Sequence, residues 1–416
     1  MRILFLTAYF HPEQAASPYL GENRNQAFAD AGYDMVVYTP TPTRGISENV
    51  RQEYKKKKME FLYDGKMIVH RFNLIGEKKN PILRAWRYTM SCIKQLYIGI
   101  FAKDARSCDI MFIASTPPIQ GAMAALIKKI RRDHIPFIYN LQDIFPDSLV
   151  GTGLAKKDGL LWKIGRVIEN FTYRNADKII VISQDFKRNI MAKGVPEEKI
   201  EVIYNWVDEQ AVVNIPRNEN KLFEKYNLNP NKFYITYCGN IGLTQNMDML
   251  LEVAKELEAE SDIHFVLIGE GAYKEKVKGI IQEKQIGNVS LLPFQAYEDI
   301  SHVFSLGDVG LVISKPGVGE NSVPSKTWSI LSASRPVLVN FDENELKDIV
   351  EKHQCGIFTK AGDKTAFKEA ILRLYHNRDL CRELGCNGRQ FILKNLTKNA
   401  GTQQYVDIIK NISRTK

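Results

Sequence analysis

Short apolar runs of strand length alternate with longer amphipathic segments along nearly the whole chain. In the first half the apolar runs are Ile3–Thr7, Asp34–Thr39, Met67–Phe72, Asp109–Ala114, Phe137–Leu141, Lys178–Ile182 and Lys199–Ile203. In the second half they are Tyr234–Cys238, His264–Ile268, Val289–Leu292, Val309–Ile313, Val337–Asn340 and Gly356–Phe358. Strands that alternate with helices are typical of parallel sheets covered by helices. The pattern therefore predicts two doubly wound α/β domains.

The segments between these runs show the periodicity of amphipathic helices. The clearest helical predictions are Tyr19–Ala31, Asn80–Arg106, Ile119–Arg131, Asp158–Asn175, Gln184–Ala192, Met249–Glu258, Tyr273–Glu283 and the tail Leu396–Ile412. By contrast, Thr41–Met59 reads as a loop that ends in the lysine run Lys55–Lys58. The segment Tyr204–Pro216 is predicted to link the two domains.

Length and composition limit the class of protein. A chain of 416 residues fits two domains of about 200 residues each. No apolar run approaches the ~18 residues of a membrane span, and Met1–Arg2 leads straight into a strand, so we expect no signal peptide. The six cysteines are scattered without Cys-x-x-Cys spacing, which argues against both a disulfide framework and a zinc site. A cytoplasmic protein is the expectation.

The positive charge is concentrated in one part of the chain. The net charge is +9, and residues 51–106 alone hold 14 Lys and Arg against 5 Asp and Glu. Within that part, Asn80–Arg106 interleaves aromatic and aliphatic residues with basic ones, as helices in a bilayer interface do. We therefore predict that 51–106 contacts an anionic membrane surface. The alternative is a domain helix whose apolar face is simply core. Nucleic acid is a weaker prediction, because no nucleic-acid-binding motif accompanies the charge.

The stretch Val309–Phe341 carries the most informative arrangement, a strand, a polar glycine-bearing loop, a short helix and a second strand. In open α/β sheets, ligands bind in the crevice at the carboxyl ends of strands. Pro324, Ser325 and Lys326 begin the helix. Ser325 is predicted to cap it, and Lys326 to offer positive charge to an anion. A buried strand–helix–strand unit with a chance lysine is the alternative.

This stretch resembles the nucleotide-sugar site of retaining GT-B glycosyltransferases of family 4. The residues Ser334–Val337 stand where that family has a "GKPV"-like strand, and Pro324–Lys326 matches the Pro-Ser-Lys motif of its bacterial surface-polysaccharide branch, which includes N-acetylfucosamine transferases. The resemblance implies two Rossmann-like domains that face a cleft. Residues 1–204 would bind the acceptor, with 396–416 packing back on them, and residues 205–395 would bind the nucleotide sugar.

The resemblance also assigns a diphosphate-binding turn. Gly239, Asn240 and Gly242 follow a strand, and glycines there let the backbone approach a diphosphate. Most relatives carry a basic residue after the first glycine and a lysine a few residues later, where this chain has Asn240 and Gln245. Because two expected cations are missing, Lys326 gains importance for stabilising charge on the leaving diphosphate.

Three further donor contacts are implied by the resemblance. The ribose-binding glutamate of the family aligns with Ser329, and the partner of that glutamate aligns next to Glu320. A serine would supply a neutral hydrogen bond in place of a charged, bidentate one. Glu320 would face the donor sugar, or is a solvated loop acid. Backbone groups near Phe294 would read the nucleobase, although a phenylalanine at a strand end is equally natural as core.

The first half offers candidate catalytic residues after two strands. Asp143 and Asp147 follow the strand Phe137–Leu141 in the sequence QDIFPD, and carboxylates at a cleft edge suit acid/base work or hydroxyl binding. Many relatives have a His-Asp pair where this chain has Gln142 and Asp143. For Asp147, capping of the following turn is the alternative. His11 follows the first strand, where relatives have a loop that touches both substrates; a lone histidine is more often structural.

Together these residues predict a retaining glycosyltransferase. It would move a sugar, N-acetylated by analogy with the branch, from a UDP-sugar to a polyprenyl-diphosphate-linked acceptor in capsule, O-antigen or exopolysaccharide synthesis. No Asp-x-Asp follows a strand, so we expect no metal and no other cofactor. The protein would lie in the cytoplasm at the inner face of the cell membrane. A UDP-sugar 2-epimerase and a non-catalytic nucleotide-sugar sensor are the alternatives.

Overall fold

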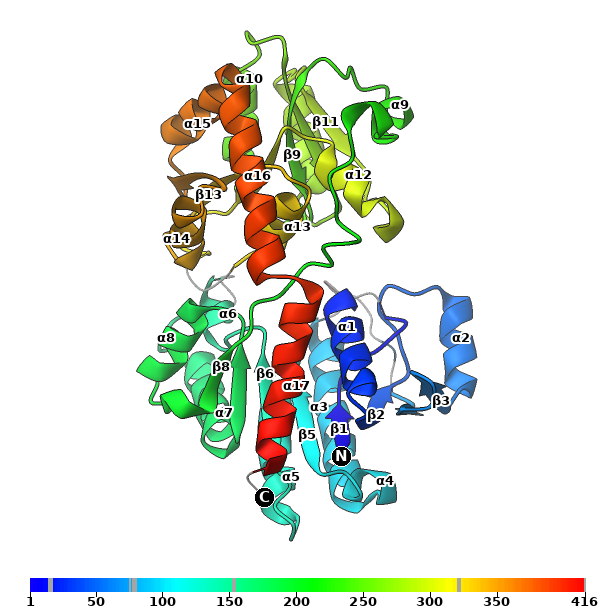
Figure 1. Cartoon of the computed structure of the whole chain (residues 1–416). Helices are drawn as coiled ribbons and strands as arrows, with labels where there is room; N and C mark the ends of the chain where they lie inside the picture. The colour runs from blue at the N-terminus through cyan, green and yellow to red at the C-terminus, as the bar shows by residue number, and fades with distance from the viewer. Residues whose placement is uncertain (14–17, 75, 77–80, 152–154, 320–322, 415–416) are drawn as a thin grey trace. The chain divides into compact units, whose positions relative to one another are not determined.

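The computed structural model describes residues 1–13, 18–74, 76, 81–151, 155–319 and 323–414 of the 416-residue chain. The chain divides into two compact units, which are considered separately below. The first comprises Met1–Tyr204 together with Thr402–Lys416, and the second comprises Asn205–Gly401. Each unit is built on its own sheet (Figure 1).

The first unit contains an eight-stranded sheet with the order β3-β4-β2-β1-β5-β6-β7-β8. Its strands are β1 (Arg2–Leu6), β2 (Asp34–Pro40), β3 (Met59–Leu62), β4 (Met67–Phe72), β5 (Ile110–Ala114), β6 (Phe137–Leu141), β7 (Lys178–Val181) and β8 (Ile200–Val202). All neighbours pair in parallel except β3, which runs antiparallel to β4. Most central strands are buried along their length, as expected for a sheet that is covered on both faces.

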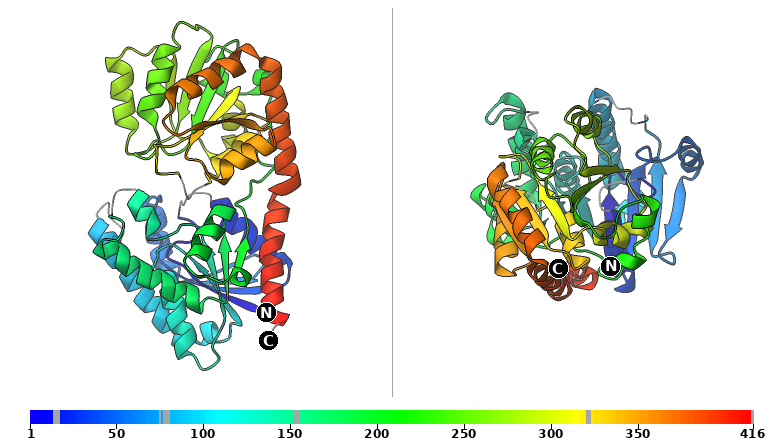
Figure 2. Two further views of the ribbon diagram at one scale, coloured as in Figure 1. Left: turned by 90° about the vertical axis from the view of Figure 1, so that its left-hand side faces the viewer. Right: turned by 90° about the horizontal axis from the view of Figure 1, so that it is seen from above.

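Helices cover the two faces of this sheet. They are α1 (Pro18–Asp30), α2 (Glu48–Lys56), α3 (Pro81–Phe101), α4 (Lys103–Arg106), α5 (Gln120–Ile130), α6 (Asp147–Gly151), α7 (Leu160–Asn175), α8 (Gln184–Ala192) and α17 (Lys398–Arg414), with a 3-10 turn at Glu197–Lys199. Phe5 and Phe112 contact Phe28 of α1 and Tyr405 of α17 on one face. On the other face, α3, α5 and α7 enclose the core that includes Leu4. Figure 2 shows α17 opposite these three helices.

The second unit contains a six-stranded, fully parallel sheet with the order β11-β10-β9-β12-β13-β14. Its strands are β9 (Phe233–Cys238), β10 (Ile263–Ile268), β11 (Val289–Leu292), β12 (Val309–Ile313), β13 (Val337–Phe341) and β14 (Gly356–Lys360). Its helices are α9 (Leu222–Lys225), α10 (Met247–Glu256), α11 (Lys274–Glu283), α12 (Ile300–Ser305), α13 (Lys326–Ser332), α14 (Glu345–Lys352), α15 (Lys364–His376) and α16 (Arg378–Asn395), with 3-10 turns at Arg217–Glu219 and Tyr297–Asp299. The two sheets confirm the predicted α/β fold class.

Side-chain caps set the start of several helices. The hydroxyls of Ser47 and Ser183 accept hydrogen bonds from the amides that open α2 and α8. Asn344, Asp363 and Asn377 do the same for α14, α15 and α16. Each cap satisfies a backbone donor that has no partner within its own helix, which fixes where the helix begins.

The linker and the C-terminal helix are both packed. In the second unit, Trp206 is buried, and a Cβ at Gly401 would lie 2.3 Å from its ring, so a glycine is needed there. From Thr402 onward, α17 belongs to the first unit. There the hydroxyl of Tyr405 donates to Oδ1 of Asn140 over 3.2 Å, which ties the chain terminus to strand β6.

Two sequence predictions differ from the structure. The segment Thr41–Met59 was expected to be a loop, but it contains α2 and the first residue of β3. The helical pattern of α2 is short, and it is stabilised by the Ser47 cap and by burial of Tyr54. The long helix predicted over Asn80–Arg106 divides into α3 and α4, because Ala102 adopts an extended conformation between them.

Among the described residues, no helix has both the length and the apolar character needed to cross a membrane.

Candidate functional site

The second unit has a crevice between β9 and β12, where the order of the strands switches from one side of the sheet to the other. Strands β9 and β12 are neighbours, but β9 leads to β10 and β11 on one side, whereas β12 leads to β13 and β14 on the other. Ligands of open α/β sheets bind at such a switch point, beyond the carboxyl ends of the strands. A pocket of about 110 Å³ lies here, lined by Thr244, Gln245, Val312, Ile313, Ser314, Val318, Pro324, Lys326 and Phe341.

Lys326 is the only charged side chain that lines this pocket among the described residues. It is the first residue of α13, and its Nζ lies 3.8 Å from the centroid of the Tyr237 ring. Burial lowers the pKa of Lys326 to about 8. Within the described part of the chain, no carboxylate forms an ion pair with it. A desolvated cation of this kind gains strongly from a bound anion.

The turn after β9 lies against Lys326. Gly239 has φ +138°, and a Cβ at this position would be 3.1 Å from Lys326 Nζ, so the glycine lets the amine approach the backbone. The amide of Gly242 donates to Oε1 of Gln245 over 3.0 Å. Gln245 therefore orders the turn through a hydrogen bond. Asn240 is exposed, and its backbone carbonyl accepts a hydrogen bond from the Tyr237 hydroxyl.

A second glycine pair supports the same turn from the neighbouring strand. A Cβ at Gly269, directly after β10, would lie 1.9 Å from the Gly239 carbonyl oxygen, and one at Gly271 would lie 2.2 Å from the Ile241 carbonyl oxygen. The amide of Ile241 donates to the Glu270 carbonyl over 2.8 Å. The turn is thus held by close backbone contacts that only glycines permit.

The residues predicted at the start of α13 lie next to the crevice, but the prediction for Ser325 is wrong. Pro324 lines the pocket, and Ser329 is half-buried one turn after Lys326 on α13. Ser325 was predicted to cap the helix, but it has a helical backbone conformation and its side chain makes no capping hydrogen bond. A capping residue needs an extended backbone to turn its hydroxyl toward the helix amides.

Of the two other predicted donor contacts, Phe294 and Glu320, the structure describes only Phe294. Phe294 follows β11 and is 71% exposed, so it is not a core residue. The next residue, Gln295, is buried and bonds the Tyr226 hydroxyl and the Pro293 carbonyl, which fixes the backbone around Phe294. Glu320 lies outside the described residues.

In the first unit, Asp143 lies at the carboxyl end of β6. The backbone amide of the preceding Gln142 donates a hydrogen bond of 3.0 Å to the Ser115 hydroxyl, which anchors the start of the loop. Asp143 is exposed. Desolvation by the surrounding protein raises the pKa of Asp143, while hydrogen bonds from the Ser148 hydroxyl and the Ile144 amide oppose that rise. Its carboxylate is therefore available to a substrate.

Asp147 is held in a polar network instead. Its carboxylate lies 2.7 Å from Lys193 Nζ, and it also accepts bonds from Trp162 and Asn189. Burial acts to raise the pKa of Asp147, but these contacts, Lys193 foremost, hold it below its ordinary value. Lys193 also contacts the buried Glu169. These contacts favour a structural role for Asp147 over that of a base.

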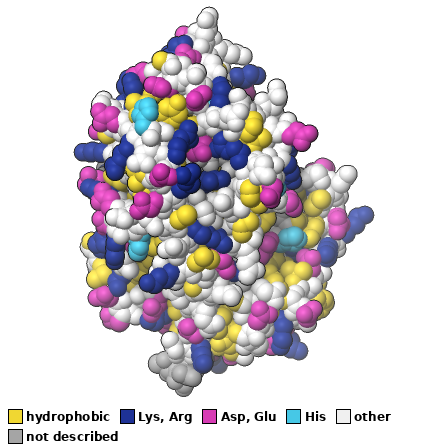
Figure 3. All heavy atoms as spheres, turned by 45° about the horizontal axis from the view of Figure 1, so that its top comes forward, with side chains coloured by type: hydrophobic (Ala, Val, Ile, Leu, Met, Phe, Trp, Pro, Cys, Tyr) yellow, Lys and Arg dark blue, Asp and Glu magenta, His cyan; other side chains and the backbone are white. Residues whose placement is uncertain are grey.

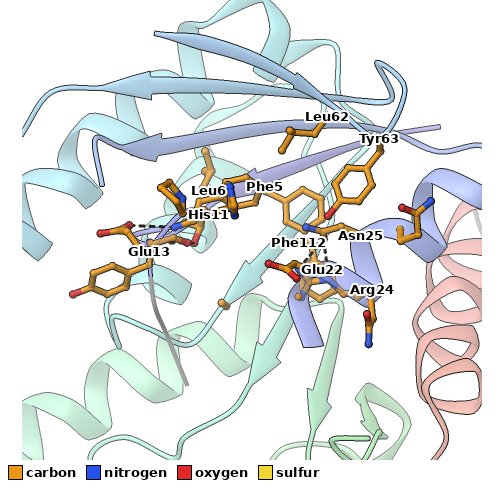
Figure 4. Close-up of a pocket in the computed structure, with 18 residues that line it drawn as sticks. Phe5, Leu6, His11, Glu13, Glu22, Arg24, Asn25, Leu62, Tyr63 and Phe112 are labelled. Atoms are coloured by element: carbon orange, nitrogen blue, oxygen red, sulfur yellow. Dashed lines mark hydrogen bonds between the residues drawn. The ribbon is translucent and has the colours of Figure 1, made fainter. Parts of the chain in front are cut away.

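His11 lies in the loop after β1, which lines a pocket of the first unit. His11 is exposed, and its carbonyl accepts a hydrogen bond of 2.6 Å from Arg71. Nearby, the buried Glu13 accepts the amides of Thr43 and Arg44. Burial raises the pKa of Glu13, and these amide bonds oppose the rise. Glu13 therefore holds the loop after β1 against the loop after β2, and His11 lies close to Glu13 (Figure 4).

The pocket has a volume of about 830 Å³. Aromatic rings of β1, β5 and the loop after β1 line it together with polar side chains of α1 (Figure 4). The guanidinium of Arg24 stacks 4.5 Å from the centroid of Phe112 and donates to Oδ1 of Asn25. Burial lowers the pKa of Arg24. Sequence reasoning missed Arg24 and Asn25, because the helical pattern of α1 does not distinguish them from surface residues.

The donor-side contact that sequence reasoning missed is Tyr237. Tyr237 is the residue before the last of β9, and only the fold brings its ring next to Lys326. Across the described ranges, no group of three or more His, Cys, Asp and Glu side chains is arranged to hold a metal ion.

Two family models match the chain. The model described as "Glycosyl transferases group 1" matches residues 218–391, and "Glycosyltransferase Family 4" matches residues 25–211. The first match contains Gly239–Gly242, Phe294 and Lys326, and the second contains Asp143.

Similar proteins carry glycosyltransferase names. One is named for colanic acid biosynthesis, glycosyl transferase WcaI of Escherichia coli, which is 28% identical over 47% of this chain and 48% of its own length. Another is the glycosyltransferase named WbjE of Pseudomonas aeruginosa, 27% identical over 56% of this chain and 58% of its own length. The chain thus spans about half the length of these curated relatives.

The whole chain also resembles solved structures. Alr3699/HepE of Anabaena, crystallised in complex with UDP, superposes with a TM-score of 0.74 at 17% identity, covering 99% of this chain and 100% of that one. At this identity the likeness bears on the fold.

Proposed function

Since this chain is a family 4-like glycosyltransferase of the GT-B type, we propose that it transfers a sugar, N-acetylated by analogy, from a UDP-sugar to a lipid-diphosphate-linked acceptor with retention of configuration. The observation that carries this proposal is Lys326, a desolvated cation at the β9–β12 crevice beside the glycine turn. The name of WcaI supports a role in bacterial surface-polysaccharide synthesis.

The second unit would bind the donor. Lys326 would contact the diphosphate, and Gly239 and Gly242 would let the phosphates approach the turn that Gln245 orders. Ser329 would bond a ribose hydroxyl from the next turn of α13. Phe294, with its exposed ring and fixed backbone, would border the uracil. The structural neighbour HepE is crystallised in complex with UDP, which supports a UDP-sugar as the donor.

The transfer step would occur on one face of the sugar. The bond between the anomeric carbon and the diphosphate oxygen breaks, and a bond from the acceptor hydroxyl to the same carbon forms on the same side. The acceptor proton passes to the departing phosphate. Lys326 would stabilise the negative charge that develops on that phosphate, and Asp143 would orient the acceptor hydroxyl.

The first unit would bind the acceptor. Its pocket of about 830 Å³ combines aromatic rings with polar side chains, which suits the apolar faces and hydroxyls of a sugar. His11 borders this pocket and would contact the acceptor. A polyprenyl-diphosphate acceptor would place the protein at the inner face of the cell membrane, with part of the basic segment 51–106 in contact with it.

We propose that no metal takes part. Lys326 would neutralise charge that a divalent ion neutralises in other transferases. Excess EDTA is therefore expected to leave the transfer rate unchanged. A loss of activity that Mg²⁺ or Mn²⁺ restores would contradict this proposal.

The test is a panel of UDP-sugars incubated with purified protein, with and without a polyprenyl-diphosphate-sugar acceptor, followed by mass spectrometry. We expect UDP release that requires the lipid, together with a product one sugar heavier. Conversion of a UDP-sugar without the lipid would instead identify an epimerase. Nucleotide-sugar binding with no conversion of any panel member, under conditions where a known transferase works, would favour a sensor.

A further inference from the structure

Three neighbouring helices of the first unit, α3, α5 and α7, carry large apolar side chains that are exposed to solvent. On α3 the exposed residues Trp86, Ile93, Tyr97 and Phe101 recur at helical spacing and form one stripe. On α5 the exposed residues are Leu126 and Ile130, and on α7 they are Leu160, Leu161, Ile164 and Val167. Tyr97, Phe101 and Val167 are each more than 60% exposed. These residues are defined here as the apolar surface.

The stripes lie next to one another. Helix α5 contacts α3 on one side and α7 on the other. A Cβ at Gly99 of α3 would lie 2.5 Å from Ile127, and one at Gly121 of α5 would lie 2.2 Å from Thr172 of α7, so both packings are close. The three helices cover the same face of the sheet (Figure 2). Their apolar residues named above are exposed to solvent.

The charge of these helices is almost entirely positive. Together α3, α5 and α7 contain eight Lys and Arg residues and one acidic residue, Glu169. Glu169 is buried and is paired with Arg166 and Lys193. Lys94, Lys129 and Lys163 are exposed beside the apolar residues. On the face drawn in Figure 3, by contrast, basic and acidic side chains are interspersed.

The same side of the sheet adds two residues beyond α3. Phe61 pairs with Ile68 and Met59 pairs with His70 across the antiparallel β3–β4 ladder, so each pair shares one face. His70 stacks on Tyr38, which belongs to the core under α3. Met59 and Phe61 are 51% and 60% exposed. They extend the apolar surface to the edge of the sheet.

We propose that the apolar surface of α3, α5 and α7, bordered by Lys94, Lys129 and Lys163, docks on an anionic lipid bilayer. Exposed Trp, Tyr and Phe side chains suit the bilayer interface, and long basic side chains suit anionic headgroups. A partner protein face would have to be acidic and apolar, and a second copy of this surface would bring the exposed Lys94, Lys129 and Lys163 against the same three lysines. Charge complementarity therefore favours the lipid. This inference rests on the proposed function for its purpose, since it would bring the enzyme to a lipid-linked acceptor.

The lysine run at 55–58 lies elsewhere. Tyr54 of α2 packs 4.6 Å from the guanidinium of Arg71, and Arg71 points to the face opposite His70 because alternate strand residues point to opposite faces. Helix α2 therefore covers the other side of the sheet, and Lys57 is paired with Glu60. Only part of the basic segment 51–106 belongs to the docking surface, and α5 and α7 contribute the rest. This gives a matched control within the chain.

The experiment is co-sedimentation of the full chain with vesicles of phosphatidylcholine, with or without phosphatidylglycerol, and with no donor or acceptor present. We expect binding only to the anionic vesicles. The variant Lys94→Glu/Lys129→Glu/Lys163→Glu should bind at least about tenfold more weakly. The control Lys55→Glu/Lys56→Glu/Lys58→Glu carries the same charge change and should bind as the wild type does. A third variant, Tyr97→Ser/Phe101→Ser/Val167→Ser, should bind the anionic vesicles more weakly than the wild type does. This loss should persist at high salt, because salt screens the contribution of the lysines but not that of the apolar side chains.

Each result decides the proposal. Absence of wild-type binding, or equal weakening by the two lysine triples, would overturn it. Light scattering without lipid covers the self-association case: a wild-type dimer that becomes monomeric in the Ser variant would identify an interface between copies and contradict lipid docking. Circular dichroism confirms folding, which exposed substitutions should preserve. Because the vesicles contain no substrate, failure here leaves the transferase proposal standing, and failure of transfer leaves this result standing.

Discussion

Lys326 shows how a single residue gains its function from its surroundings. The Pro-Ser-Lys sequence identifies it, but its lowered pKa comes from burial above Tyr237, which sequence spacing does not reveal. The charged lysine contributes binding energy only while it is protonated. Donor binding should therefore depend on pH near the pKa of this side chain.

We predict that Lys326→Ala lowers turnover at least about tenfold, or roughly 1.4 kcal/mol of barrier. In the wild type, kcat/KM for the donor should fall as the pH rises through about 8, because the free enzyme loses the Lys326 proton there. Lys326→Arg should move this fall to higher pH. Steady-state kinetics across the pH range measures both effects, and unchanged turnover of the alanine variant would remove Lys326 from the reaction.

Asp143 is the carboxylate of the 140–147 loop that the structure leaves available. We predict that Asp143→Asn abolishes transfer while UDP still binds, because the change removes charge but keeps the shape and the bond to Ser148. Calorimetry with UDP and a transfer assay separate the two readouts. Asp147→Asn is the companion variant: it should lower thermal stability through the lost Lys193 ion pair. Equal loss of UDP binding in Asp143→Asn would indicate a structural role.

At the scale of elements, the glycine turn depends on the neighbouring strand. We predict that Gly269→Ala destabilises the protein by about 2 kcal/mol, since its φ is +152° and its Cβ would meet the Gly239 carbonyl. Donor affinity should fall as well, because the turn shifts. Gly279→Ala in α11 is the control: nothing lies within 4 Å of its Cβ, and the helix should gain about 0.5–1 kcal/mol. Denaturant melts compare them; equal effects would contradict the assignment.

The sequence predicted most elements, because apolar runs such as Val309–Ile313 and Phe137–Leu141 are long enough to identify buried strands. It failed at α2 and β3, which are short and are stabilised by tertiary contacts such as Tyr54 on Arg71. Candidate residues with a motif, such as Lys326 and Asp143, could be named in advance. Arg24 and Tyr237 could not, because only folding brings them to their pockets. The Ser325 cap failed because the backbone is helical there.

At the scale of the whole chain, the two units supply different chemistry. The second unit presents a desolvated cation and a glycine turn at the β9–β12 crevice. The first presents an aromatic and polar pocket on one side, and the apolar surface of α3, α5 and α7 on the other face of its sheet. This division would suit the proposed UDP-sugar donor in water and the proposed acceptor in lipid.

The most direct test of this account is hydrogen–deuterium exchange of the full chain with and without UDP. We predict slower exchange at residues 239–246 and 323–329, which form the turn and the start of α13, and little change around α3, α5 and α7. Protection confined to the first unit, or absent at saturating UDP, would contradict a donor site at the β9–β12 crevice.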